Sequence, residues 1–145
     1  MRIVDANVLL YAVNQDAPQH VASVGWLDLA LGGADSVGLS WIALLAFTRL
    51  ATKPGLFPRP LTTDEAMTQV VSWCGAPGAV TIHPKASHAT TLRQILNDAG
   101  AAGNLVNDGH LAALAVEQHG DIVSYDSDFL RFSAIRCYTP EQLLD

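Results

Sequence analysis

Four aspartates stand at the ends of apolar runs, and together they could hold a metal ion. Asp5 interrupts the apolar stretch MRIVDANVLLYAV, and Asp108, Asp126 and Asp128 border apolar runs in the last third of the chain. Carboxylates that come close together repel one another, and one of them takes up a proton unless a cation lies between them. Mg²⁺ and Mn²⁺ prefer oxygen ligands and can neutralise charge on a phosphate ester. The pattern therefore predicts a metal site suited to phosphodiester hydrolysis.

Each aspartate also has a purely structural explanation. Asp108 could cap the helix that follows it, an interaction worth about 1 kcal/mol. Asp126 and Asp128 could be ordinary turn residues, because Asp favours turns. Asp5 could cap a helix that starts near Asn7, although an unpaired charge between apolar runs is costly. The metal hypothesis therefore depends on the combination of the four positions.

Short apolar strands alternating with helices would position these aspartates. Strands are predicted at residues 2–5, 36–40, 79–82, 122–125 and 135–138, and helices at 7–13, 18–31, 41–52, 62–74, 87–99 and 107–119. This alternation is typical of a parallel α/β sheet with helices on both faces, although the strand order is not readable from one sequence. Ligands of such sheets bind outside the carboxyl ends of the strands, which is where Asp5 and Asp126 would lie. Asp108, which with Asn107 is a candidate cap of the late helix, is expected near the same edge.

The composition restricts the class of protein. The 145 residues suit one domain, residues 1–145. The formal net charge of −6 argues against a broad basic surface that binds nucleic acid. It does not argue against an enzyme that binds nucleic acid through a metal ion and a few basic residues. Because 50% of the residues are hydrophobic and 15% are charged, part of the surface is expected to be covered by another subunit or a partner.

Location and redox state follow from what the sequence lacks. No signal peptide and no uncharged apolar run of about 20 residues is found, so a soluble cytoplasmic protein with no membrane partner is expected. Cys74 and Cys137 could form one disulfide, but a core of this size does not need it. Two free thiols are therefore predicted.

Three segments resemble the PIN-domain ribonucleases, and most closely the VapC toxins of bacterial toxin–antitoxin pairs. They are IVDANVLLYA near the start, NLVNDGHLAALAVEQHG, and IVSYDSDFLRF. The resemblance covers essentially the whole chain. It implies a PIN-like three-layer α/β domain with a central, mostly parallel sheet of short strands flanked by helices. It also implies an acidic Mg²⁺ or Mn²⁺ pocket that cleaves RNA, a VapB-type antitoxin and a homodimer.

The resemblance assigns a role to each aspartate by its position. Asp5, Asp108 and Asp126 match metal-binding aspartates of the family. Asp128 matches an extra acidic residue beside the last of them, so that all four are candidate catalytic residues.

One position departs from the family pattern. The family commonly carries a glutamate three residues before an arginine that is Arg49 here, and Ala46 takes its place. Asp128 or an additional water is therefore expected to complete the shell of the metal. Asn7 and Ser124 match small polar residues that hydrogen-bond to the carboxylates or their waters.

Two surfaces are candidates for binding partners. Arg49, Lys53 and Arg59 are clustered and could hold RNA phosphates near the pocket, although a merely solvated loop is the simpler interpretation. The apolar helices within residues 7–31 and 41–52 could form a groove for an antitoxin segment. An arginine of that antitoxin could displace the metal from the acidic pocket.

Three functions remain open from the sequence. The leading hypothesis is a metal-dependent endoribonuclease toxin. A phosphotransferase that forms an aspartyl phosphate on Asp5 would need an acid where Asn7 stands and a late lysine, and the last lysine is Lys85. The third is a catalytically weak PIN-like domain that binds RNA or antitoxin without efficient cleavage, which Ala46 favours.

Overall fold

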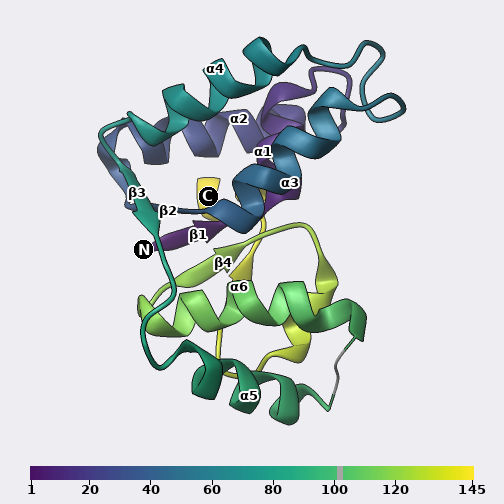
Figure 1. Ribbon diagram of the computed structural model, residues 1–145. Coiled ribbons are helices and arrows are strands. Elements are labelled where there is room, and N and C mark those ends of the chain that lie inside the picture. Colours follow the sequence, from purple (N-terminus) through teal and green to yellow (C-terminus); the bar gives the residue numbers. More distant parts are fainter. Residues whose placement is uncertain (101–102) are drawn as a thin grey trace.

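A parallel sheet of five strands forms the centre of the protein (Figure 1). The computed structural model describes residues 1–100 and 103–145. The strands are β1 (Arg2–Val4), β2 (Val37–Ser40), β3 (Ala79–Ile82), β4 (Asp121–Val123) and β5 (Cys137–Tyr138). They lie in the order β3-β2-β1-β4-β5, and every neighbouring pair is parallel, which confirms the predicted fold class. The chain therefore leaves β1 in one direction and later returns to its other side, so the carboxyl ends of β1 and β4 form the switch point where ligands bind in such sheets.

Helices cover both faces of the sheet (Figure 1). One face carries α1 (Ala6–Val13), α2 (His20–Leu29), α3 (Trp41–Thr52) and α4 (Thr63–Cys74), and the other carries α5 (His88–Ala99) and α6 (Val106–Glu117). The remaining elements are η1 (Ala30–Ala34), η2 (Gly103–Leu105), η3 (Ser127–Arg131) and α7 (Pro140–Leu144). Within the described residues, no helix has the length and apolar character needed to cross a membrane.

The side chains of the central strands point alternately to the two faces of the sheet, and a separate hydrophobic core lies on each face. Ile3 and Ile122 pack into the core beneath α5 and α6, whereas Val4 and Val123 pack into the core beneath α1 to α4. All four side chains are fully buried. Successive side chains of a strand point to opposite faces, so the last two residues of β1 and of β4 must both be apolar. These short strands are thus held rigidly, and they fix the positions of the residues that follow them.

The start of α6 differs from the prediction. The helix begins at Val106, directly after the 3₁₀ turn η2, and neither Asn107 nor Asp108 caps it. The cap position is Leu105, which offers no side-chain acceptor, because the preceding turn leads straight into the helix. The Asp108 carboxylate therefore lies in the first turn and is free for another role.

The C-terminal region is also more helical than predicted. The last strand is shortened to Cys137–Tyr138, and α7, which was not predicted, follows it. Thr139 and Gln142 form a capping box at its start, with Pro140 in the first turn. The signal for this helix was present in the sequence TPEQ.

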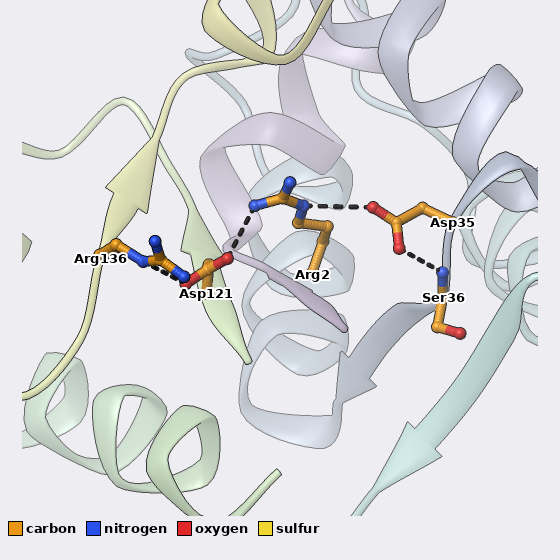
Figure 2. A network of polar contacts seen from close by, with 5 residues as sticks. All are labelled: Arg2, Asp35, Ser36, Asp121 and Arg136. Atoms are coloured by element: carbon orange, nitrogen blue, oxygen red, sulfur yellow. Dashed lines mark hydrogen bonds and ion pairs between the residues drawn. The ribbon is translucent and has the colours of Figure 1, made fainter. Parts of the chain in front are cut away.

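A network of ion pairs joins the starts of the strands (Figure 2). Arg2 donates from Nε to Asp35 Oδ2 at 3.1 Å and from Nη1 to Asp121 Oδ2 at 2.8 Å. Arg136 Nε donates to Asp121 Oδ1 at 3.2 Å, and Asp35 Oδ1 accepts from the Ser36 N–H at 2.8 Å. These residues lie at the amino ends of the strands, at the edge opposite Asp5 and Asp126. The network therefore stabilises the sheet and stands apart from the candidate site.

A buried carboxylate connects α5 to α6. Glu117 accepts a hydrogen bond from the Lys85 N–H at 2.9 Å, and its Oε2 lies 2.5 Å from His88 Nδ1. The other ring nitrogen of His88 lies 2.8 Å from His110 Nδ1. Because a buried charge needs such partners, this network has a structural role in holding the two helices together.

Both cysteines are free, as predicted. Burial raises the pKa of Cys137 to about 11, so its thiol stays protonated at neutral pH.

Candidate metal centre

Three aspartates converge beyond the carboxyl ends of β1 and β4. Asp108, Asp126 and Asp128 each offer a carboxylate oxygen, and these oxygens all lie within 4.8 Å of one another. Asp108 comes from the first turn of α6, whereas Asp126 caps η3 and accepts from the Asp128 N–H at 2.9 Å. Oxygen ligands of Mg²⁺ lie at about 2.0–2.1 Å from the ion, so opposite ligands are about 4 Å apart. The donor type and spacing of this acidic group therefore fit one such ion.

Asp5 lies beside the acidic group and is held firmly. Its Oδ1 accepts from the Ala6 N–H at 2.8 Å, which makes it the cap of α1. Its Oδ2 accepts from Ser124 Oγ at 2.7 Å and from Asn7 Nδ2 at 3.2 Å. The structural explanation for Asp5 is thus correct, and it leaves open a second role for the same carboxylate.

Ser124 and Asn7 join Asp5 to the end of β4. The buried Ser124 hydroxyl, which donates to Asp5, accepts from Asn7 Nδ2 at 3.0 Å and from the Asp126 N–H at 3.0 Å. Asn7 Oδ1 accepts from the Tyr125 N–H at 3.2 Å. The two residues therefore connect Asp5 to the backbone of the acidic group.

The predicted metal ligands are Asp5, Asp108 and Asp126, whereas the structural group contains Asp128 in place of Asp5. The two sets share Asp108 and Asp126. Asp128 is exposed at the rim and Asp5 is more deeply placed. The metal-binding and catalytic roles of all four aspartates remain predictions.

The electrostatics of the site favour a bound cation. The pKa of Asp108 is raised to about 6, chiefly by burial and then by the charges of Asp126, Asp5 and Asp128. Burial is also the largest cause that raises the pKa of Asp5, and it is opposed by the hydrogen bonds from Ser124 and Ala6. Among residues 1–100 and 103–145, no Lys, Arg or His forms an ion pair with these aspartates. Their mutual repulsion is therefore uncompensated within the described chain.

A hollow of about 150 Å³ lies between the acidic residues and α3. Asp5 and Asp108 line one part of it, and Ile42 and Ala46 of α3 line another. Ile42 was missed from the sequence, although it precedes Ala46 by four residues and so lies on the same side of the helix. Ala46, where the family resemblance places a glutamate, thus borders the candidate site.

The three predicted RNA-binding residues lie beyond this hollow. Arg49 follows Ala46 by three residues on α3, and Lys53 follows Arg49 by four, just past the end of the helix. Because residues three or four positions apart lie on the same side of a helix, Arg49 and Lys53 lie on the side of α3 that carries Ala46. Arg59 lies in the next loop, where its guanidinium is 4.0 Å from Glu65 and almost fully solvated. Arg49 and Lys53 are therefore better placed than Arg59.

Residues 2–135 match the family model described as the PIN domain. The chain belongs to the PIN-domain family. Ribonuclease VapC37 of Mycobacterium tuberculosis (strain ATCC 25618 / H37Rv) is 58% identical to it over 144 residues, which cover 99% of this chain and 100% of that protein. Ribonuclease VapC31 of the same strain is 36% identical over 140 residues, covering 97% and 99%. These identities confirm the resemblance and place this PIN domain among the VapC-type proteins.

Solved structures with low sequence identity share the fold of this PIN domain. VapBC2 from Rickettsia felis, bound to a promoter DNA fragment, has a TM-score of 0.69 at 16% identity, covering 95% of this chain and 97% of that chain. VapBC-1 from nontypeable Haemophilus influenzae has a TM-score of 0.67 at 12% identity, covering 97% and 98%. Membership of this family gives no support to the aspartyl-phosphate hypothesis.

Proposed function

We propose that this protein is a VapC-type toxin that hydrolyses RNA phosphodiester bonds with Mg²⁺ or Mn²⁺ and is neutralised by a VapB-type antitoxin. The observation that carries the proposal is the group of Asp108, Asp126 and Asp128 beside Asp5, uncompensated by any described cation. The similarity to the ribonucleases VapC37 and VapC31 supports the same activity.

The surroundings of each aspartate favour a particular role in holding the metal ion. Asp108 and Asp126 would hold the ion together with Asp5, which lies beside them. When bound, the ion neutralises charge on the phosphate and makes water a better nucleophile. Ser124 and Asn7 hold the Asp5 carboxylate in one orientation, which is the usual task of residues behind a metal ligand. The Asp128 carboxylate, exposed at the rim, would contribute a further oxygen ligand, as the spacing of the acidic group allows.

One experiment tests the function as a whole. Purified protein is incubated with total RNA and Mg²⁺ or Mn²⁺, with and without chelator, beside the Asp5→Asn variant. Cleavage at specific sites that is lost both with chelator and in Asp5→Asn supports the nuclease. RNA binding without cleavage by the wild-type protein would instead support the catalytically weak PIN-like domain, which the absence of an acid at Ala46 favours.

Arg49 and Lys53 guide RNA phosphates toward the acidic group. Changing both to Gln should weaken the binding of single-stranded RNA and should lower the salt dependence of binding by about 0.7 in log–log slope for each lost phosphate contact. Fluorescence anisotropy in chelator measures binding without cleavage. Arg93→Gln, on α5 at the other face of the sheet, is the matched control. An equal loss per removed charge in Arg93→Gln would show that only net charge matters.

The protein forms a homodimer and binds its antitoxin through exposed apolar side chains. Trp41 and Leu45 are exposed on α3, and Met67 and Val71 are exposed on α4. Exposed apolar side chains grouped on neighbouring helices mark surfaces that partners cover. The solved VapBC complexes support an antitoxin as one such partner. An arginine of that antitoxin at the acidic group would compete with the metal for the carboxylates.

A further inference from the structure

A second hollow lies on the other side of the acidic group, at the carboxyl ends of β4 and β5. It measures about 190 Å³, and Asp126, Leu130, Tyr138, Thr139 and Gln142 line it. The first hollow belongs to the β1 and α3 side of the sheet, so Asp126 and its neighbours stand between the two. An RNA strand whose scissile phosphate lies at the acidic group would therefore place an adjoining nucleotide at this second hollow.

Leu130 provides an exposed apolar wall. Leu130 is 75% exposed, although it lies only two positions after Asp128. The turn that carries it is anchored, because Phe129 and Phe132 on either side are buried in the core. A large apolar side chain held in solvent next to a polar site suits the flat face of a nucleobase, since single-stranded RNA is read through contacts with base faces and base edges.

Gln142 provides a free hydrogen-bond donor. Its Oε1 accepts from the Thr139 N–H at 2.9 Å in the capping box of α7, and this bond fixes which end of the amide is oxygen. Within the described chain, the amide NH₂ of Gln142 has no acceptor. Burial keeps the nearby Cys137 thiol neutral, with a pKa of about 11, so no thiolate competes for that donor. The lining thus includes an apolar wall and an oriented hydrogen-bond donor.

We propose that this hollow binds one base of the RNA substrate, on a nucleotide adjoining the scissile phosphate, and selects it through Leu130 and the Gln142 NH₂ group. The inference rests on the proposed function, because it takes the acidic group as the site of cleavage. The volume is below the range of about 300–1,000 Å³ for drug-sized ligands, which suits a single base. The donor favours uracil and guanine, which present a carbonyl oxygen where cytosine and adenine carry an amino group.

Two variants test the base site without disturbing the fold. Gln142→Glu keeps the oxygen that accepts from Thr139 and replaces the donor with an acceptor. Leu130→Ala removes the apolar wall from an exposed position. Leu29→Ala, an exposed leucine on α2, and Gln94→Glu on α5 are the matched controls. Thermal unfolding verifies that all four variants are folded.

Two readouts are needed, one with cleavage and one without. Sequencing the ends of a cleaved random RNA library gives the base preference at each position around the cut. At one adjoining position, Gln142→Glu should shift the preference by about tenfold toward cytosine and adenine, and Leu130→Ala should flatten it. NMR titration with adenosine, guanosine, cytidine and uridine in chelator should move amide signals around the hollow, most strongly for one nucleoside.

The outcomes separate the two proposals. Cleavage by the wild-type protein with unchanged preferences in both variants, and no nucleoside shifts at the hollow, would overturn the base site and leave the nuclease standing. Nucleoside shifts at the hollow without any cleavage would support the base site and refute the nuclease. If neither appears, both proposals are wrong.

Discussion

Asp108→Asn should abolish RNA cleavage and, in the absence of divalent metal, should make the folded protein more stable above about pH 6. The variant removes one carboxylate of the group whose oxygens lie within 4.8 Å of one another. Even replacing a residue that only supports a metal ligand costs about 10–100-fold in metal affinity or activity, so the loss of a ligand should cost at least about 100-fold.

The gain in stability follows from the pKa of Asp108. It is raised from 3.8 to about 6, first by burial and then by Asp126, Asp5 and Asp128. The folded state therefore binds this proton more tightly than the unfolded chain does. Below pH 3.8 the group is protonated in both states, and it costs the fold nothing. Between pH 3.8 and about 6 the unfolded chain releases the proton while the folded state keeps it, so the stability of the fold decreases. Above about pH 6 the penalty is complete.

Asparagine removes this penalty because it carries no charge. Asp108 is partly exposed, so solvent screening reduces the effect, and an increase in Tm of a few degrees is expected. Thermal unfolding in chelator from pH 3.5 to pH 8 measures it, and the difference between variant and wild type should vanish at the acidic end. Asp98→Asn, an exposed aspartate on α5, should change neither cleavage nor this profile. A lower Tm for Asp108→Asn at pH 8 would contradict the electrostatic account of the site.

Local pattern was sufficient to predict most of the fold. The strand at residues 122–125 and the helix at 41–52 could be located because an apolar run and a helical spacing are properties of neighbouring residues. The start of α6 was misplaced because it depends on the 3₁₀ turn before it, which carries no comparable signal. Asp108 was consequently assigned a possible capping role that it does not have.

The contacts of the site depend on information that one sequence lacks. Asp5 and Ser124 touch only because β4 lies next to β1, and neighbouring strands in a sheet need not be close in sequence. For the same reason the hollow at Ala46 could not be foreseen, since it forms where α3 passes the acidic residues. The four aspartates could be found in the sequence as a set, whereas the distances between their carboxylate oxygens required the structure.

Ala46→Glu should increase the affinity for Mg²⁺ or Mn²⁺ by at least about tenfold. Ala46 borders the hollow of about 150 Å³ that Asp5 and Asp108 also line, so a longer side chain has room to reach them. A further carboxylate beside the four aspartates adds attraction for the cation, because affinity for hard cations rises with the number of charged oxygen ligands. A tenfold change corresponds to about 1.4 kcal/mol, and isothermal titration with Mn²⁺ measures it directly.

The same substitution should have the opposite effect without metal. A further negative charge beside Asp5 and Asp108 increases their repulsion, so the Tm in chelator should fall at pH 8 and should be restored by Mn²⁺. Ala46→Gln is the matched control, because it fills the same space and adds no charge. If Gln raised the metal affinity as much as Glu, filling of the hollow and not charge would explain the gain. If Glu left the affinity unchanged, the ion would lie too far from α3 for residue 46 to contribute a ligand.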